Sequence, residues 1–398
     1  MPDPALPAAL TDLFDRPDAA DLSPRALSQI PAVPDPPPNL VQEARPGYSA
    51  PAPPYYSSAD GNLRLYQADS LELLRRMRDE SVDMIFADPP YFLSNGGITC
   101  VGGRMVRVDK GGWDKSQGII GDHSFNLLWL DQCRRILKPN GTIWVTGTSH
   151  NIHSVGYALQ VLDYKILNDI AWYKINPPPN LACRYFTHAT ETIIWAAKSV
   201  KSKHTFNYPL MKEQNGGKQM KSLWEILPPG KSEKRHGKHP TQKPEALLWR
   251  IVAASTQPGE IVLDPFCGSA TTGVACARLG RQFIGIEREQ EYLVLAESRL
   301  REVSKSVTLV FVFADEPMST SDNEIFKVET KLMTWNDTVV FALTTLGGEG
   351  NLKEINRVVG ASQRIKSNPT WASTVRRTVR QSPMISAVGR GRYKLYAN

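Results

Sequence analysis

Apolar and polar residues alternate along the middle of the chain in a repeating order of short apolar runs and amphipathic stretches. Runs rich in aliphatic and β-branched residues predict strands, and apolar positions spaced three and four apart predict helices. In the first half of the chain the segments are, beginning with a strand and alternating, LRLYQAD, LELLRRM, VDMIFAD, FNLLWLDQCRRILKPNG, TIWVTG and IHSVGYALQVL. After Lys238 they are, beginning with a helix, PEALLWRIVAAST, EIVLDP, TTGVACARLG, QFIGIE and EYLVLAESRLREV. This alternation predicts a doubly wound α/β sheet.

Two further strands, YKILNDIAWYK and ETIIWAAK, follow one another without a helix between them. We expect them to form a late antiparallel pair, so that the sheet is mixed and has seven strands. The long helix FNLLWLDQCRRILKPNG is expected to close at Pro139 and Gly141, because proline and glycine commonly end helices. Between Ser199 and Lys238 the periodicity fades, and lysine, glycine and polar residues dominate.

The two ends of the chain differ from this central unit. Residues 1–58 hold fourteen of the thirty prolines, which predicts a flexible or polyproline arm. A linker is expected near Asp315–Asp322, so that the central domain spans 59–315. Residues 323–398 contain three short helical patterns and a hairpin around Gly389, an order that favours a winged helix-turn-helix domain.

Charge, hydropathy and cysteine spacing narrow the class of protein. The net charge is +7, and from Gly360 onward eight Lys or Arg residues occur without any acid, which favours a phosphate-bearing partner such as DNA. The five cysteines are widely spaced, with no CxxC pair, which argues for reduced thiols in a cytoplasmic protein and against a disulfide framework or a metal site. No apolar run reaches about 18 residues, so we expect no membrane span. The first residues do not resemble a secretory signal.

The most informative motif is Asp88-Pro89-Pro90-Tyr91, which follows the apolar run VDMIFA. It places a carboxylate and an aromatic ring at the carboxyl end of a strand, the edge where α/β sheets bind ligands. The two prolines fix the backbone and donate no N–H, so the carbonyls of the turn point in set directions. Such a turn is suited to an exocyclic amine on a nucleobase. A proline turn without any site is the alternative interpretation.

A second motif, VLDPFCGSATTG, contains the end of the predicted strand EIVLDP. The strand ends at Asp264, small residues form the turn, and a helix begins near Thr271. Small residues let the backbone approach a ligand closely, and a helix N-terminus is electropositive. The next strand ends at Glu287, where an acid suits the hydroxyls of a ribose. Taken alone, this turn is also compatible with a generic βαβ connection that binds nothing.

Together the two motifs resemble those of the amino-group DNA methyltransferases, which use S-adenosylmethionine. The catalytic motif precedes the cofactor turn, as in the permuted β class, and HPTQKP before the turn is similar to that class's remaining cofactor motif. The resemblance covers residues 60–303. Segments similar to the GATC-specific N6-adenine methyltransferases of restriction–modification systems are IFADPPYFLSNGG, VDKGGWDK, NPPPNLACRYFTHATETIIWA and GKHPTQKPE. Ala270 departs from the family pattern, which usually has a third glycine there.

The resemblance implies a Rossmann-like methyltransferase fold and a role for each matching position. The implied catalytic residues are Asp88, Pro89, Pro90 and Tyr91. The implied cofactor-binding residues are Asp69, Thr241, Lys243, Asp264, Phe266, Gly268, Ser269 and Glu287. Within this set Glu287 would bind the ribose hydroxyls and Asp69 the adenine amine of the cofactor. By sequence alone Asp69 is equally suited to cap the helix that follows it.

The motif also implies a mechanism for adenine. The Asp88 side chain and the Pro89 carbonyl would accept hydrogen bonds from the N6 amine, which makes the nitrogen more pyramidal and frees its lone pair for the sulfonium methyl group. The base must leave the duplex to reach this turn, and Tyr91 would stack on it. Asp at position 88 favours adenine, because the N4-cytosine enzymes of the family usually have Ser there.

Target recognition is expected from polar stretches outside the two motifs. The segments 95–116 and 199–238 are basic and would supply mainly phosphate contacts. For base contacts we favour Asn180, Arg184 and Tyr185. In the C-terminal domain the expected DNA contacts are Arg376, Arg377, Arg380, Arg390 and Arg392. A protein-docking or purely structural role is the alternative for that domain.

The leading hypothesis is therefore site-specific N6-adenine methylation of DNA by base flipping, at GATC. Methylation of cytosine N4 or of adenine in RNA is the first alternative. Methylation of protein glutamine is disfavoured by the permuted motif order and by the basic stretches. A DNA-binding regulator with an inactive methylase core is the alternative outside enzymes. A homodimer is compatible with the class, although no interface can be identified from the sequence.

Overall fold

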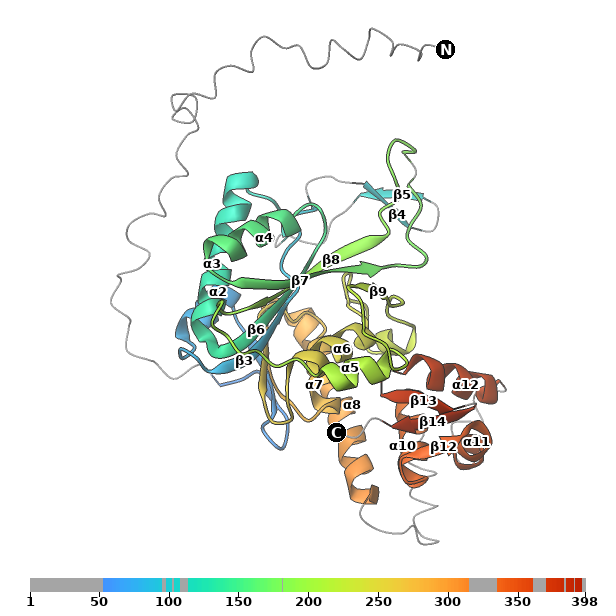
Figure 1. Cartoon of the computed structure of the whole chain (residues 1–398). Coiled ribbons are helices and arrows are strands. Elements are labelled where there is room, and N and C mark those ends of the chain that lie inside the picture. The colour runs from blue at the N-terminus through green and yellow to red at the C-terminus, as the bar shows by residue number, and fades with distance from the viewer. Residues whose placement is uncertain are drawn as a thin grey trace, which may run out of the picture. The chain divides into compact units, whose positions relative to one another are not determined.

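The structure is a computed structural model, which describes the chain in nine segments (Figure 1). These segments are residues 53–94, 98–101, 104–107, 114–180, 182–314, 335–360, 370–382, 384–389 and 391–395. Most of the predicted arm 1–58 and the whole predicted linker lie outside them, as do Arg390 and parts of the predicted recognition segment 95–116.

The centre of the fold is a nine-stranded mixed sheet with the order β1-β2-β11-β10-β3-β6-β8-β7-β9. The strands are β1 (Tyr56–Ser57), β2 (Leu63–Gln67), β3 (Val82–Ala87), β6 (Leu137–Gly147), β7 (Lys165–Tyr173), β8 (Thr190–Ala197), β9 (Leu223–Glu225), β10 (Ile261–Asp264) and β11 (Gln282–Glu287). Strands β2, β11, β10, β3 and β6 run parallel. Strand β8 is antiparallel to both of its neighbours, β6 and β7.

The prediction of a mixed α/β sheet with a late antiparallel pair is confirmed. The predicted strand number is not, because the described sheet has nine strands. The two additional strands, β1 and β9, are two and three residues long and lie at the edges of the sheet. Such short edge strands carry no alternation of apolar and polar residues that a pattern could detect.

Helices cover both faces of the sheet. One face packs against α2 (Ser70–Arg76), α3 (Ile119–Ile136) and α4 (Ile152–Val161) around the buried sheet residues Ile85 and Ile143. The other packs against α6 (Glu245–Ser255), α7 (Thr271–Arg278) and α8 (Gln290–Ala314), around Phe86, Trp144 and Phe283. Because helices bury both faces, the central strands are apolar on both sides, which explains the continuous run VDMIFA.

Several boundaries differ from the predicted ones. Helix α3 starts at Ile119 and ends at Ile136, and residues 137–141, predicted to close the helix, belong to β6. Helix α8 continues beyond the predicted pattern to Ala314. The stretch whose periodicity fades contains α5 (Tyr208–Gln214), β9 and a short 3-10 helix at Ser232–Lys234. The predicted segment 95–116 contains a hairpin of β4 (Ile98–Val101) and β5 (Arg104–Arg107).

The C-terminal residues form three helices and a small antiparallel sheet. In chain order the elements are α10 (Trp335–Thr345), β12 (Glu349–Asn351), α11 (Leu352–Gly360), α12 (Trp371–Gln381), β13 (Ile385–Gly389) and β14 (Arg392–Leu395). The sheet has the order β12-β14-β13. Residues Val375 and Val379 of α12 are buried in the core of this unit, as the amphipathic pattern predicts.

Three neighbouring strands bring the sequence motifs to one place. Strands β11, β10 and β3 are adjacent and parallel, and they end at Glu287, Asp264 and Ala87. Asp88 follows β3 directly. The catalytic and cofactor motifs therefore meet at the carboxyl edge of the sheet, although they are far apart in the sequence.

Candidate active site

The catalytic turn, Asp88–Tyr91, begins where β3 ends, and the Asp88 side chain is only 15% exposed. Its Oδ1 accepts hydrogen bonds from the Thr146 hydroxyl at 2.6 Å and from the Tyr91 hydroxyl at 2.7 Å. Its Oδ2 lies 2.5 Å from the Lys243 Nζ. Both oxygens of the predicted catalytic carboxylate are therefore held by neighbouring side chains.

These neighbours decide the charge of Asp88. Burial alone would raise the pKa of the carboxyl group, but the Lys243 ammonium and the hydrogen bonds from Thr146 and Tyr91 outweigh it, so the pKa of Asp88 lies below its ordinary value. Burial and the adjacent carboxylates raise the pKa of Tyr91 well above its ordinary value. At neutral pH Asp88 is thus an ionised acceptor, and the Tyr91 hydroxyl is a donor.

The backbone of the catalytic turn is held by Asp114, which is fully buried. Asp114 Oδ1 accepts the N–H of Tyr91 at 2.9 Å and of Phe92 at 2.8 Å, and Oδ2 accepts the N–H of Leu93 at 3.1 Å. The Ser94 hydroxyl also donates to Oδ2, at 2.9 Å. One carboxylate therefore satisfies three successive backbone donors. Phe92 has a left-handed backbone, with φ 58°, which these bonds stabilise.

The Tyr91 ring is buried, with 6% exposure, and its hydroxyl points to Asp88. The Lys243 ammonium lies over the ring, 5.3 Å from its centroid. The base-stacking role predicted for Tyr91 therefore requires a rearrangement of Lys243 or of the ring. Phe92 lies at 6.0 Å from Phe125 in an edge-to-face arrangement, so it contributes to an apolar wall.

The cofactor turn joins β10 to α7. Asp264, at its start, is buried and accepts hydrogen bonds from the Thr272 hydroxyl at 2.5 Å and from the Phe266 N–H at 3.1 Å. Burial raises the pKa of Asp264 to about 7. Ser269 is also buried, and both its carbonyl and its hydroxyl accept hydrogen bonds from Arg299. Asp264 and Ser269 therefore hold the turn in shape from inside the protein.

Two positions of this turn have a left-handed backbone. Gly268 has φ 49°, and a Cβ there would come within 2.8 Å of the His239 ring, so only glycine allows this close approach. Ala270, where the family usually has glycine, has φ 52° and is fully buried. The alanine therefore accepts a conformation that costs an L-residue roughly 1–2 kcal/mol.

Glu287, at the end of β11, connects this turn to the start of α8. Its Oε2 accepts the N–H of Gly268 at 2.9 Å, and its Oε1 accepts the N–H groups of Arg288 and Glu289, both at 2.8 Å. Burial raises the pKa of Glu287 above its ordinary value, although these backbone bonds oppose the shift. Glu287 is thus a fixed acceptor at the surface of the cavity described next.

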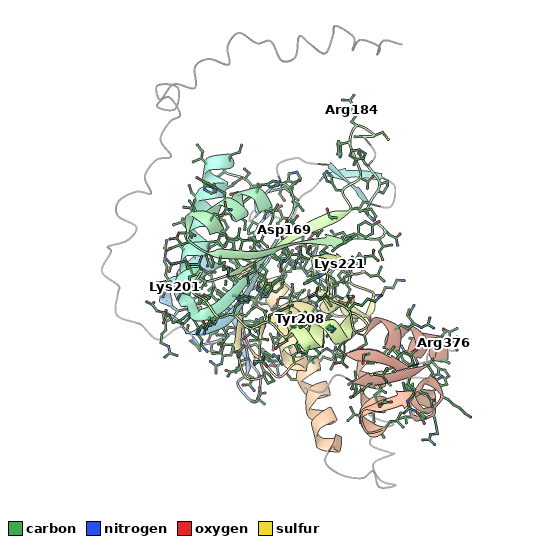
Figure 2. The ribbon with its side chains drawn as sticks, viewed as in Figure 1. Asp169, Arg184, Lys201, Tyr208, Lys221 and Arg376 are labelled. Atoms are coloured by element: carbon green, nitrogen blue, oxygen red, sulfur yellow. The ribbon has the colours of Figure 1, made fainter. Side chains whose placement is uncertain are left out.

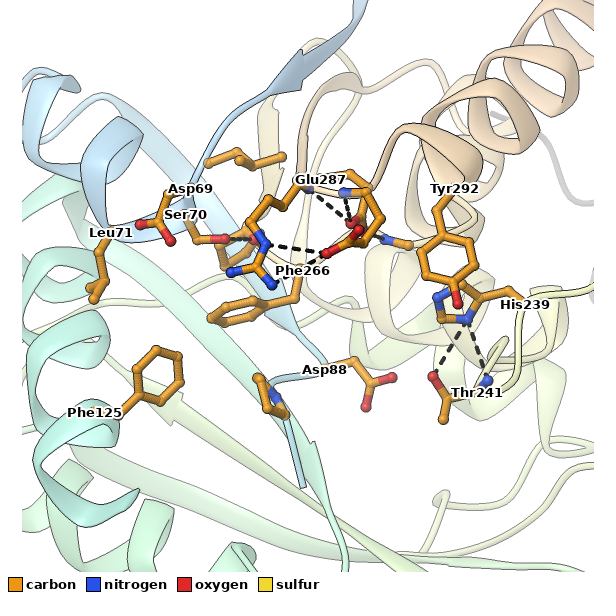
Figure 3. A pocket seen from close by; sticks show the side chains of 16 residues that line it. Asp69, Ser70, Leu71, Asp88, Phe125, His239, Thr241, Phe266, Glu287 and Tyr292 are labelled. Atoms are coloured by element: carbon orange, nitrogen blue, oxygen red, sulfur yellow. Dashed lines mark hydrogen bonds and ion pairs between the residues drawn. The ribbon is translucent and has the colours of Figure 1, made fainter. Parts of the chain in front are cut away.

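A cavity of about 160 Å³ opens between the two motifs (Figure 3). Asp69, Leu71 and Phe125 lie on one side of it, His239 and Tyr292 lie on the other, and Asp88 lies between them. The cavity is lined by Asp69, Ser70, Leu71, Asp88, Pro90, Phe125, His239, Thr241, Pro265, Phe266, Gly268, Ile286, Glu287, Arg288, Glu289 and Tyr292. It combines aromatic walls, acidic acceptors and a glycine turn, the features of a nucleotide-like ligand site.

The structure brings some predicted cofactor residues to the cavity and not others. Those that line it are Asp69, Thr241, Phe266, Gly268 and Glu287. Asp69 also caps α2, because its side chain accepts the Glu72 N–H at 3.1 Å, so the two roles weighed for it are compatible. The lining does not include Lys243, Asp264 or Ser269.

Several residues of this region carry no motif that predicts a role for them. Phe125, Tyr292 and Ser70 line the cavity, and His239 packs edge-to-face on Tyr292 at 4.3 Å. His239 belongs to the quoted HPTQKP motif, which was the one available signal. The others come from helices whose core-facing pattern does not distinguish a wall of a cavity from ordinary packing.

The predicted base-contacting residues lie in the loop between β7 and β8 (Figure 2). Arg184 is exposed and points outward, and Tyr185 is 61% exposed. The Asn180 amide is used within the loop, donating to the Tyr185 carbonyl at 2.6 Å and accepting from the Ala182 N–H at 3.1 Å. Asn180 therefore shapes the loop, and Arg184 and Tyr185 are its accessible groups.

The predicted basic residues of the C-terminal unit are also accessible. Arg376, Arg377 and Arg380 of α12 are exposed, opposite the buried face of that helix. Arg392 is exposed as well, and it forms an ion pair with Glu349 at 2.9 Å. Arg390, predicted to contact DNA, lies outside the described residues.

Comparison with known proteins decides the family. A family model described as "DNA methylase" matches residues 82–298, which include both motifs and all of the residues that line the cavity except Asp69, Ser70 and Leu71. The chain belongs to this family. Its members' chemistry, methyl transfer to DNA, agrees with the ionised Asp88 and the glycine turn, and the prediction of an S-adenosylmethionine-dependent DNA methyltransferase is confirmed.

Curated members of this methylase family are close to the chain in sequence. The Type II methyltransferase M2.LlaDCHI of Lactococcus lactis subsp. cremoris is 58% identical over 250 residues, which are 63% of this chain and 92% of that protein. The Type II methyltransferase M2.DpnII of Streptococcus pneumoniae is 56% identical over 248 residues, 62% of this chain and 92% of that protein. M2.MboI of Moraxella bovis is 51% identical over 251 residues, 63% and 92% of the two chains.

Among solved structures, the cytosine-N4-specific PvuII DNA methyltransferase has a TM-score of 0.50 and 20% identity, over 78% of this chain and 97% of that chain. At this identity the likeness shows the methyltransferase fold alone.

Two further observations concern the described residues only. They contain no cluster of three His, Cys, Asp or Glu suited to a metal ion. None of their helices has the length and apolar character needed to cross a bilayer.

Proposed function

We propose that this DNA methyltransferase modifies adenine N6, in the sequence GATC, after flipping the base out of the duplex. The observation that carries the proposal is the ionised Asp88 carboxylate at the edge of the cavity, held by Thr146, Tyr91 and Lys243. An amine bound there meets an acceptor that cannot donate, which suits the two hydrogens of an exocyclic amino group. The resemblance to GATC-specific enzymes in four separate segments supports the sequence of the site.

The cavity residues fit S-adenosylmethionine, which supplies an electrophilic methyl group when bound. Phe125 and Phe266 would contact the purine ring, and Asp69 would accept from its amine. Glu287 suits the ribose hydroxyls, and Gly268, which has no Cβ, leaves room beside His239. Thr241, near Asp88 on the same cavity, would lie at the methionine end of the ligand.

The chain's own groups would then orient the target amine. The Asp88 carboxylate and the Pro89 carbonyl accept its two hydrogens and direct the nitrogen lone pair to the methyl group. Asp114 keeps both acceptors in place through the backbone bonds of the turn. Catalysis of this kind depends on position and charge and needs no covalent enzyme intermediate.

We further propose that the C-terminal unit is a winged-helix domain that adds DNA affinity. Its order of elements, helix, strand, helix, helix and two strands, supports this assignment, and the exposed face of α12 carries Arg376, Arg377 and Arg380. The domain boundaries 59–315 and 323–398, a cytoplasmic location and a homodimer stay predictions.

The function is tested with purified protein, S-adenosylmethionine and single- or double-stranded oligonucleotides that contain GATC or a scrambled site. After digestion to nucleosides, mass spectrometry counts N6-methyladenine and N4-methylcytosine, with Asp88→Ala as the control. We expect N6-methyladenine only in the GATC substrates and none with the variant. Product in scrambled strands would refute the site, and N4-methylcytosine would refute the base.

A further inference from the structure

The Lys243 ammonium forms an ion pair with the Asp88 carboxylate, the proposed acceptor for the target amine. Its side chain is 7% exposed, and Nζ lies 2.5 Å from Asp88 Oδ2. The sequence motif assigns Lys243 to the cofactor, but Lys243 is not among the residues that line the cavity. Within this site the contact needs an explanation, because a buried ion pair adds little net stability compared with well-packed apolar residues.

The pair leaves at most one acceptor position on Asp88 for a target amine, the second lone pair of Oδ2. Oδ1 already accepts the hydroxyls of Thr146 and Tyr91, at 2.6 Å and 2.7 Å. Oδ2 is held by Lys243. An exocyclic amine that approaches Oδ2 therefore competes with Lys243 for the same oxygen. The lysine ammonium ends a flexible four-carbon side chain, so it can move aside with less rearrangement than the hydroxyls of Thr146 and Tyr91.

A second carboxylate lies on the other side of Lys243. Glu191, on β8, is 11% exposed, and its Oε2 lies 3.8 Å from the Lys243 Nζ. Glu191 Oε1 is paired with Lys174, and its Oε2 also receives the Tyr91 hydroxyl at 3.4 Å. A short movement of Lys243 would therefore exchange Asp88 for Glu191 without taking the ammonium out of the cluster.

We propose that Lys243 is a positioning residue that holds Asp88 while no base is bound and moves onto Glu191 when the target amine takes its place. This inference rests on the proposed function, because it requires an amine that binds Asp88. Glu191 then becomes a determinant of the reaction, although it does not contact the base. Until the base binds, the ammonium donates an N–H to the same Asp88 oxygen, Oδ2, that would accept an N–H of the substrate amine.

The charges of the cluster agree with this exchange. Burial lowers the pKa of Lys243, but Asp88 and Glu191 outweigh it and raise the pKa above its ordinary value, so Lys243 is an ammonium and not a base. The charged or titratable groups that face Asp88 are Lys243 and Tyr91, with Glu191 beyond them and Asp264 on the neighbouring strand. Because Lys243 stays within the cluster, Asp88 remains ionised after the exchange.

A double-mutant cycle tests the coupling. The variants are Glu191→Gln, Lys243→Met and both together, with Glu225→Gln, an exposed acid on β9, as the control. We expect Glu191→Gln to slow single-turnover methylation at least about tenfold, because Lys243 has no second carboxylate and stays on Asp88. In the Lys243→Met background, Glu191→Gln should not lower the methylation rate further, because the ammonium that would move onto Glu191 is absent.

The pH dependence separates this role from a merely structural one. Burial raises the pKa of Asp88, and the Lys243 ammonium is one of the groups that lower it. Removing the ammonium should therefore raise the pKa of Asp88. The acid limb of the rate profile of Lys243→Met should therefore move to higher pH, with the rate recovering as pH increases. Lys243→Gln is carried through the same cycle if Lys243→Met does not fold, as judged by thermal melting and cofactor binding.

A binding measurement needs no turnover. Duplexes with adenine or with purine, which lacks the amine, at the target position are compared by fluorescence anisotropy in the presence of S-adenosylhomocysteine. We expect the wild type to prefer adenine and Glu191→Gln to lose that preference. The exchange would be overturned if Glu191→Gln and Lys243→Met lowered the methylation rate by independent factors that multiply in the double variant, and if Glu191→Gln kept the preference for adenine. The wild type would still be active in that case. A wild type that modifies no DNA would instead overturn the proposed function.

Discussion

The catalytic turn and the loop between β7 and β8 show opposite ways of holding functional groups. In the turn, Asp114 binds three successive N–H groups, and the Tyr91 ring is 6% exposed. In the loop, the Asn180 amide makes two bonds within the loop, and the Phe186 ring beyond it is 95% exposed. The backbone N–H donors of the turn find their acceptors within the protein, whereas the loop exposes aromatic side chains to the solvent.

The contrast is the one expected if the turn performs the chemistry and the loop, as we propose, recognises DNA. Methyl transfer needs acceptors fixed within fractions of an ångström, so the turn is defined by buried hydrogen bonds. Recognition needs aromatic and cationic groups that remain solvent-exposed until DNA arrives. An apolar ring as exposed as Phe186 adds nothing to the folded state by burial, and in a DNA-modifying enzyme it is suited to stacking on a base or entering the duplex.

The largest effect is expected where the turn loses its support. Asp114→Asn replaces one of the two acceptor oxygens with an NH₂ group. If the amide oxygen keeps the bonds to Tyr91 and Phe92, the Leu93 N–H loses its acceptor and faces another donor. We expect kcat to fall on the order of 10²-fold, because a displacement of about 1 Å in a catalytic group costs that much. Rapid-quench kinetics with a GATC duplex measures the change.

The comparison variant is Asp131→Asn, an exposed acid on α3. It should leave kcat unchanged. The affinity of Asp114→Asn for S-adenosylmethionine, measured by calorimetry, should also stay close to that of the wild type, because Asp114 does not line the cavity. A variant that loses cofactor binding and kcat in parallel would show that Asp114 supports the whole fold and not the turn.

A smaller effect, on affinity and not on chemistry, is expected in the loop. Phe186→Ala should weaken binding to a GATC duplex about tenfold, since stacking of an aromatic side chain on a base contributes roughly 1–3 kcal/mol. Because Phe186 is 95% exposed, its removal should leave the melting temperature unchanged. Anisotropy titrations with cognate and scrambled duplexes measure both affinity and preference.

Val161→Ala, in which a half-exposed apolar residue at the end of α4 is shortened, is the control for a general loss of apolar surface. Equal affinity of Phe186→Ala and the wild type for the cognate duplex would show that the loop is not a recognition element. In that case the comparison between the two regions would describe packing alone.

Much of the fold follows from local patterns. The seven longer strands of the sheet and the helices between them lie close to their predicted positions, because burial on both faces leaves continuous apolar runs in the sequence. The short strands β1 and β9 could not be predicted, since two or three residues have no period. The proline and glycine of residues 137–141 predict a helix end. In the structure Leu137 instead pairs with Val82 of β3, and the register shifts before pairing resumes at Thr142.

The site was predictable only as far as its motifs reach. The motif DPPY locates the acceptor, and the glycine turn locates one wall of the cavity. Of the groups that lower the pKa of Asp88, Tyr91 belongs to the motif itself, but Lys243 lies 155 positions and Thr146 lies 58 positions away from Asp88. Asp114 and Glu191 are ordinary acids in polar or strand segments, and only the folded chain shows that both are buried against the turn.

The smallest effect is expected in the C-terminal unit, and it extends the comparison to a second exposed region. Arg376 is exposed on α12, while Val375 and Val379 of the same helix are buried, so its guanidinium is available without a cost to packing. If this helix contacts phosphate, Arg376→Ala should weaken cognate and scrambled duplexes alike and reduce the slope of log K against log salt by about 1. Arg357→Ala, an exposed arginine on α11, is the matched control. An unchanged salt slope in Arg376→Ala would remove α12 from the DNA interface and leave recognition to the catalytic domain, because neutralised phosphates, unlike stacked bases, always appear in the salt dependence.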